Sequence, residues 1–161
     1  LSRDTAGKHH PDDIEVYNGL LADGATIRIQ GGTLLKNKLT PGPQVEVMPE
    51  GQLAAEDFLS TLDVFYYRTS PQVIETFGRV VLEAMACGLS VVCHKDGGYA
   101  DHIRHGENGF LFETTHEAAQ ILTSLKANPA LRARVGHSAR QTAESLFSSQ
   151  AIKERLSFYL S

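Results

Sequence analysis

The chain has 161 residues, of which 42% are hydrophobic and 21% charged, and its formal net charge at pH 7 is -4. This length suits one domain with a core of its own and leaves little for a second. The negative charge argues against a general nucleic-acid-binding protein, which is usually basic. No apolar run approaches the ~20 residues that a membrane-spanning helix needs. Cys87 and Cys93 lie in apolar stretches, which predicts buried free thiols in a reducing compartment.

The first part of the chain, residues 2–11, is polar and has no hydrophobic period, so it is predicted to be a loop. Arg3 and Lys8 are the cations of this loop. His9 and His10 are interpreted as loop residues, because no carboxylate or cysteine cluster with metal-ligand spacing accompanies them. The sequence therefore predicts no metal site.

The rest of the chain alternates between strand and helix patterns. Alternating or β-branched apolar residues predict strands at 25–30, 45–48, 63–67, 90–93 and 110–112. Apolar residues at helical spacing predict helices at 11–23, 54–62, 79–87, 100–103, 117–126 and 129–146, and a last helix from 148 or 149. Thr114 or Thr115 is the expected cap of the helix at 117–126. The last helix carries a predicted apolar stripe of Ile152, Leu156, Tyr159 and Leu160.

This alternation predicts an α/β fold with a Rossmann-like parallel sheet and helices on both faces. Ligands of such sheets bind beyond the carboxyl ends of the strands. The loops expected at that edge hold Arg3 and Lys8, Gly31 and Gly32, and residues 49–51, 70–78 and 96–98. We expect these loops to converge on one rim.

The most informative stretch is 70–88, where Glu75 and Glu83 are separated by seven residues. Residues 79–87 contain no glycine or proline, which predicts a helix that a loop feeds at Gly78. A helix N-terminus suits a phosphate, and a glycine lets the backbone approach a ligand closely. Carboxylates accept hydrogen bonds from hydroxyl groups. A phosphate between hydroxyl-bearing groups is the outline of a nucleotide sugar.

The residues from Glu75 to Val92 resemble the signature of the retaining glycosyltransferases of the large family four, which have the GT-B fold. The resemblance is carried by Glu75-Thr76-Phe77-Gly78 and Glu83-Ala84-Met85-Ala86-Cys87-Gly88. Downstream, residues 97–101 are similar to the family's Gly-Gly-x-Pro-Glu turn, with alanine and aspartate replacing the last two residues. Residues 106–112 resemble its Gly-x-Asn-Gly turn and the following strand.

The resemblance implies that residues 1–161 form a single nucleotide-sugar-binding domain, the C-terminal half of a GT-B fold. A hydrophobic strand and an N-terminal acceptor domain would precede Leu1. The full-length protein would be a hexosyltransferase that moves a sugar from a nucleoside-diphosphate sugar to a hydroxyl, with retention at the anomeric carbon. The isolated chain would bind a nucleotide weakly and transfer nothing.

The resemblance also implies roles for individual residues. Lys8, Arg3 and Glu75 would be the catalytic set, with the two cations on the donor diphosphate and Glu75 on hydroxyls of the donor sugar. A residue before Leu1 is an alternative to Arg3. Glu83 would accept hydrogen bonds from the ribose diol. The other donor-binding residues would be Phe77, Gly78, Arg79, Gly31 and Gly32.

The implied donor is a UDP- or GDP-sugar, with no cofactor, and the sequence has no Asp-x-Asp pair. The acceptor would be a sugar or a lipid-linked glycan bound by the N-terminal domain, and no nucleic-acid partner is expected. The implied location is cytoplasmic, with peripheral association of the full-length enzyme at the inner membrane face.

Two alternatives remain open on the sequence alone. One is a nucleotide-sugar epimerase of related architecture, with acids on a similar rim. The other is a degenerate domain kept for assembly. Arg79 stands where the family usually has an aliphatic or aromatic residue, so it is either a phosphate ligand or an exposed cation.

Overall fold

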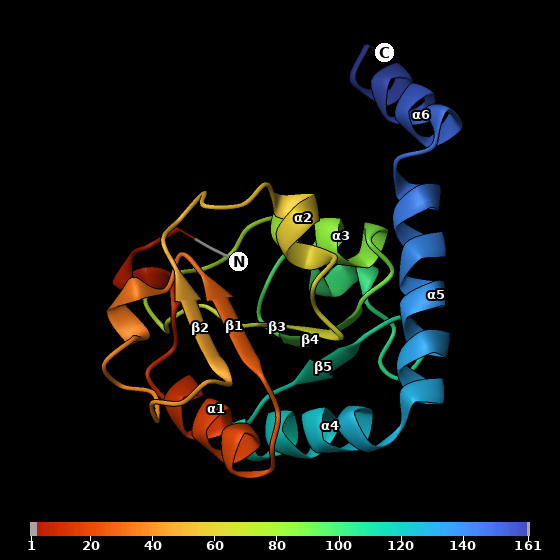
Figure 1. Ribbon diagram of the computed structural model, residues 1–161. Coiled ribbons are helices and arrows are strands. Elements are labelled where there is room, and N and C mark those ends of the chain that lie inside the picture. The colour runs from red at the N-terminus through yellow and green to blue at the C-terminus, as the bar shows by residue number, and fades with distance from the viewer. Residues whose placement is uncertain (1–2, 161) are drawn as a thin grey trace.

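A computed structural model describes the backbone of residues 3–160 (Figure 1). The strands are β1 (Ile27–Gln30), β2 (Val45–Met48), β3 (Val64–Tyr67), β4 (Ser90–His94) and β5 (Phe110–Phe112). The helices are α1 (Asp13–Ala22), α2 (Ala55–Leu59), α3 (Arg79–Ala86), α4 (Thr115–Ala127), α5 (Pro129–Leu146) and α6 (Ser149–Leu160). Short 3-10 helices occur at η1 (Ala6–Lys8), η2 (Thr33–Leu35) and η3 (Ala100–His102).

Within residues 3–160 the strands form two parallel sheets, whereas the sequence predicted one. β1 pairs with β2, and β3, β4 and β5 pair in that order, all in parallel. A cavity of about 450 Å³, lined by residues of both strands, lies between β1 and β3. The prediction of parallel strands is confirmed, but backbone hydrogen bonds do not cross from β1 to β3 in the described chain.

Helices cover both faces of the larger sheet, as predicted. Phe65 and Tyr67 of β3 pack in one cluster with buried residues of α3 and α5. Val64 and Tyr66 of the same strand face the other way and pack with residues of α1 and α4. This alternation follows the period of two residues in a strand, and it places Tyr66 and Tyr67 on opposite faces.

The helix boundaries follow from local chemistry. The Thr114 side chain accepts a hydrogen bond from the Glu117 amide (3.2 Å), and the Glu117 carboxylate accepts one from the Thr114 amide (3.2 Å). This capping box confirms Thr114 as the cap and starts α4 at Thr115, two residues before the predicted start.

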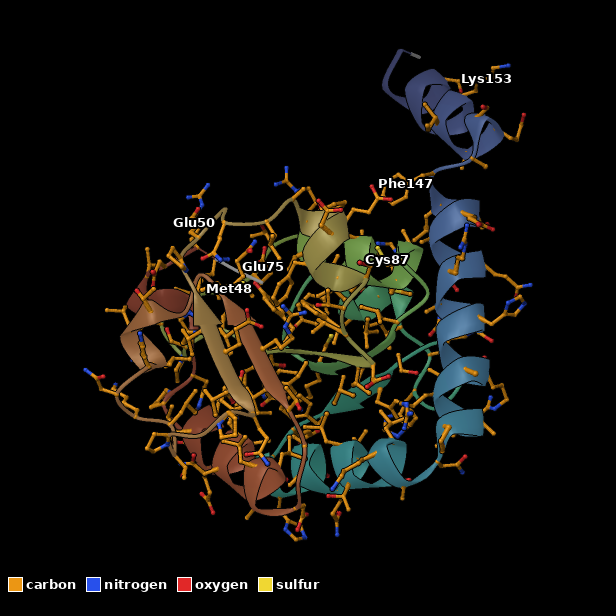
Figure 2. All side chains as sticks on the ribbon, in the orientation of Figure 1. Met48, Glu50, Glu75, Cys87, Phe147 and Lys153 are labelled. Carbon is orange, nitrogen blue, oxygen red and sulfur yellow. The ribbon has the colours of Figure 1, made fainter. Side chains whose placement is uncertain are left out.

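The C-terminal part projects from the body of the domain. In Figure 1, α6 lies beyond the end of α5 and away from the sheets. Phe147, between the two helices, is 49% exposed (Figure 2). The side chains that would complete the predicted stripe of α6, those of Leu156, Tyr159 and Leu160, lie outside the described residues. No helix in the described part of the chain is both long and apolar enough to cross a membrane.

The two cysteines differ from each other. Cys93 is buried in β4, as predicted, and burial raises the pKa of its thiol. The prediction that Cys87 is buried is wrong, because this residue is exposed at the end of α3 (Figure 2). It lies four residues after Glu83, on the helix face opposite the buried Val81 and Met85.

Helix α5 approaches the turn that follows α3 through glycine. A Cβ atom on Gly136, in the middle of α5, would lie 2.1 Å from the carbonyl oxygen of Gly88. A backbone atom cannot move aside as a flexible side chain can. Packing therefore requires glycine at position 136.

We predict that Gly136→Ala lowers the free energy of unfolding by about 1–3 kcal/mol, because the added methyl group overpacks this contact. Gly19→Ala is the matched control, since Gly19 lies inside α1 with no atom within 4 Å of an added Cβ. The control should gain up to about 1 kcal/mol from better helix propensity. Urea denaturation measures both, and a stabilised Gly136→Ala protein would contradict the packing argument.

Candidate functional site

The segment before α1 crosses the carboxyl ends of the strands and is tied to the loops that follow them. The Thr33 amide, after β1, donates to Asp4 Oδ1 (3.0 Å), and the Asp4 amide donates to Glu50 Oε2 (3.1 Å), after β2. The Ser70 amide, after β3, donates to the carbonyl of Gly7 (3.1 Å). In Figure 2, Met48, Glu50 and Glu75 lie on the same side of the molecule. The predicted convergence of these loops on one rim is confirmed.

The Glu75 carboxylate is the centre of this rim. Its Oε2 atom accepts hydrogen bonds from Lys8 Nζ (2.6 Å) and from the Tyr67 hydroxyl (2.8 Å). Its Oε1 atom accepts one from the Gly78 amide (3.1 Å). The Lys8 and Glu75 side chains are 25% and 17% exposed. Two predicted site residues from distant parts of the chain are therefore in direct contact and open to solvent.

These contacts set the ionisation of the cluster. Burial alone would raise the pKa of Glu75, but the hydrogen bonds from Lys8, Tyr67 and the Gly78 amide together lower it below its usual value. Burial, followed by the hydrogen bond to Glu75, raises the pKa of Tyr67. Glu75 is thus a carboxylate and Tyr67 a neutral donor at physiological pH.

Gly78 has a left-handed backbone (φ 70°) and caps the N-terminus of α3. A Cβ atom there would lie 2.3 Å from Cδ1 of the buried Tyr99, so both conformation and space require glycine. The Gly98 amide donates to the backbone carbonyl of Glu75 (2.8 Å), which ties the turn at 97–98 to the loop at 70–78. The turn at 97–98 thereby positions the start of α3, whose first amides have no partner within the helix.

The other predicted residues lie at different distances from this centre. Gly31 joins the rim through its carbonyl oxygen, 2.7 Å from His9 Nε2, and Gly32 is buried beside it. Phe77 is 50% exposed next to Gly78, and Arg3 is exposed at the start of the described chain. Phe77 adjoins Gly78 in the chain, and Gly31 contacts His9, the neighbour of Lys8.

Glu83 and Arg79 form their own pair on α3. Arg79 Nε lies 3.2 Å from Glu83 Oε1, and the two side chains are 85% and 37% exposed. Glu83 is therefore not enclosed among the apolar residues that precede it. It sits on the open side of the helix, one turn from the N-terminus that carries Gly78.

Sequence reasoning missed two buried hydroxyl contacts at the end of β3. Tyr67 donates to Glu75, as described. On the opposite face, the Tyr66 hydroxyl (2.7 Å) and Arg68 Nε (2.9 Å) donate to Asp13 Oδ1. Asp13 and Arg68 are 2% and 7% exposed. The sequence feature that could have indicated these contacts is the polar run Tyr66-Tyr67-Arg68 at the end of an otherwise apolar strand.

Parallel strands flanked by helices, with a charged rim at the carboxyl ends of the strands, make this a Rossmann-like α/β domain, a class that binds ligands at that edge. The family model described as "Glycosyl transferases group 1" matches residues 34–142. This match covers more than half of the chain, so the chain belongs to that family.

Solved structures share the fold. Alr3699/HepE of Anabaena, in complex with UDP, is similar with a TM-score of 0.79 at 23% identity, over 99% of this chain and 47% of that one. A glycosyltransferase from Rickettsia africae ESF-5 is similar with a TM-score of 0.79 at 20% identity, over 98% and 45%. At these identities the likeness concerns the fold alone.

Curated relatives match over shorter stretches. Spore coat protein SA of Bacillus subtilis is 36% identical over 97 residues, which is 58% of this chain and 25% of the relative. The N-acetyl-alpha-D-glucosaminyl L-malate synthase of Bacillus anthracis is 40% identical over 81 residues, which is 48% and 21%. The matched part of the chain thus spans about a quarter of these relatives.

We predict that the stability advantage of the wild type over Glu75→Gln depends on pH. The folded state lowers the pKa of Glu75 below its ordinary value of 4.5, so the ionised form is stabilising above that pH. This contribution is lost as pH falls through the lower folded pKa. Urea unfolding at several pH values between 7 and 3 should show the advantage shrink on acidification.

Glu15→Gln, on the exposed side of α1, is the control for loss of one carboxylate. Its effect should stay within about 0.5 kcal/mol throughout. If the stability advantage of the wild type over Glu75→Gln instead grew toward pH 3, the folded state would not be stabilising the ionised form of Glu75.

Proposed function

We propose that this chain is the donor-binding domain of a retaining glycosyltransferase that uses a nucleoside-diphosphate sugar. The observation that carries the proposal is the contact of Lys8 and Glu75 beside the N-terminus of α3, in a chain that belongs to the group 1 glycosyl transferases. One rim thus offers a cation, a helix N-terminus and a carboxylate. These groups match a diphosphate attached to a hydroxyl-rich sugar.

In this proposal Lys8 binds the donor diphosphate and offsets the negative charge that develops on it as the sugar leaves. Arg3 supplies a second cation from the same segment. The first amides of α3 and the positive end of its dipole face the phosphate, with the backbone of Phe77 and Gly78 close to it. The Arg79 side chain is 85% exposed, and it either reaches a phosphate oxygen or keeps its ion pair with Glu83.

The two acids recognise hydroxyl groups. Glu75 accepts hydrogen bonds from the donor sugar, since its side chain is partly open and its orientation is set by Lys8, Tyr67 and the Gly78 amide. Glu83, on the open side of α3, accepts hydrogen bonds from the ribose diol. Gly31 and Gly32 provide a close backbone approach on the other side of the rim.

The donor is a UDP- or GDP-sugar, and UDP is the first nucleotide to test because Alr3699/HepE was solved with UDP and with UDP-glucose. The acceptor, a sugar or a lipid-linked glycan, would bind a second domain outside residues 1–161. The full-length enzyme would work in the cytoplasm, at the inner face of the membrane when the acceptor is lipid-linked.

The cavity between β1 and β3 supports the proposal that chain outside residues 1–161 adds to this domain. Residues of β1 and β3 line this cavity, and each strand is parallel to its own sheet partner. We propose that one more parallel strand, from outside residues 1–161, fills it. Such a strand would pair with both edges and join the two sheets into one.

Calorimetric titration with UDP, GDP, ADP and their glucose conjugates tests the donor site. We expect one nucleotide series to bind, and Glu83→Ala to weaken that binding about tenfold, or ~1.4 kcal/mol. Glu144→Ala is the matched control, because it removes a similar Arg–Glu pair, Arg140 with Glu144 (2.9 Å), from α5. Sugar transfer by the isolated chain, or equal effects of the two variants, would contradict the proposal.

Hydrogen exchange tests whether a further strand fills the cavity between β1 and β3. The amides of β1 (Ile27–Gln30) and β3 (Val64–Tyr67) should exchange more slowly in the full-length protein than in residues 1–161, because a paired edge opens less often. The amides of α5 serve as the reference for general stability. Equal protection of the two strands in both proteins would argue against a strand in this cavity.

A further inference from the structure

Tyr67 lies at the buried end of β3, and its hydroxyl reaches the Glu75 carboxylate on the solvent-open rim. It is 5% exposed and is the last residue of β3. Its ring stacks with Phe65 (centroids 6.0 Å apart, 14° between planes) and meets Tyr99 edge to face (5.8 Å, 79°). The ring is therefore fixed on two sides, and its hydroxyl points to Glu75 Oε2 at 2.8 Å.

Glu75 Oε2 has a second partner of a different kind. Lys8 Nζ binds the same oxygen at 2.6 Å, but a lysine is a point charge on a flexible stem of four carbons. In the function proposed above, the diphosphate attracts this ammonium group. A carboxylate that depended on Lys8 alone would lose its orientation when Lys8 turned toward the phosphate.

We propose that Tyr67 is a positioning residue, whose hydroxyl holds the Glu75 carboxylate toward the donor sugar while Lys8 engages the diphosphate. This inference rests on the proposed function and deepens it. Tyr67 does not touch the donor. It acts through Glu75, because its rigid ring fixes one oxygen of the carboxylate and the Gly78 amide fixes the other (3.1 Å).

The surroundings keep the Tyr67 hydroxyl a donor. Among the described residues, Lys8 and Tyr67 bind Glu75, and the Glu75 carboxylate also acts on Tyr99. Burial raises the pKa of both tyrosines, and the adjacent carboxylate raises that of Tyr67 further. The proton therefore stays on the phenol across the physiological range, and the carboxylate stays ionised opposite it.

The residue before Tyr67 in the chain, Tyr66, provides a matched control. Tyr66 is also partly buried, and its hydroxyl also donates to a carboxylate, Asp13 Oδ1, at 2.7 Å. It points to the other face of β3, away from Glu75. Tyr66→Phe and Tyr67→Phe thus remove the same atom from the same strand, and only Tyr67→Phe removes it from Glu75.

The experiment compares these two variants with the wild type in residues 1–161 and in the full-length protein. Carbon-13 NMR follows the titration of the Glu75 side-chain carboxyl, and calorimetry measures binding of UDP and of UDP-glucose, or of the corresponding guanosine pair. In Tyr67→Phe we expect the Glu75 midpoint to move to higher pH, since a hydrogen bond to its ionised form is lost. We expect affinity for the nucleotide sugar to fall about tenfold and affinity for the bare nucleotide to stay within about twofold.

Tyr66→Phe should leave the Glu75 titration and both affinities unchanged. Equal effects of the two variants, or an unmoved Glu75 titration in Tyr67→Phe, would overturn the inference while donor binding by the wild type still supported the proposed function. A wild-type full-length protein that bound no nucleotide sugar would overturn the proposed function itself, and with it the role of Tyr67 toward the sugar.

Discussion

The carboxylate of Glu75 joins three parts of the chain that are far apart in sequence. Lys8 comes from η1, Tyr67 from the end of β3, and the Gly78 amide from the start of α3. Hydrogen bonds stabilise a partly buried charge, so these three partners together hold the carboxylate in the orientation that the structure shows. The loop at 70–78 therefore has a defined shape, although it carries exposed apolar residues such as Ile74. The geometry of the rim depends on this shared carboxylate.

A second buried carboxylate fixes the opposite face of the same strand. Asp13, in the first turn of α1, is held by Arg68 and by the Tyr66 hydroxyl. An ion pair of this kind gains little over an apolar contact, but removing one partner leaves a charge buried and unpaired. Its effect is to lock the start of α1 to the end of β3. The segment that carries Lys8 lies just before α1, so it is anchored at both the Gly7 carbonyl and Asp13.

The glycines of the family signature have structural roles here beside any role in binding. A Cβ atom on Gly98 would lie 1.9 Å from the carbonyl oxygen of Thr76, and one on Gly78 would meet the ring of Tyr99. At Gly98 backbone packs directly on backbone, and at Gly78 the backbone packs on the Tyr99 ring. The turn at 97–98 and the start of α3 thus form one unit, and Tyr99 fills the space beneath it. The same residues that identify the family also build the platform on which the rim rests.

The sequence by itself determined the order and type of the strands and α-helices, because hydrophobic period, caps and glycine positions are local properties; it did not indicate the short 3-10 helices η1 and η2. It also determined the composition of the rim, since the loops after parallel strands must meet at one edge. Only the tertiary structure showed that Tyr67, rather than a residue of the signature, completes the Glu75 cluster. It alone showed that Asp13 is buried with Arg68, that Cys87 is exposed, and that the strands form two sheets around a cavity. These features depend on distances between side chains and strand edges far apart in sequence, which the local pattern of one chain does not contain.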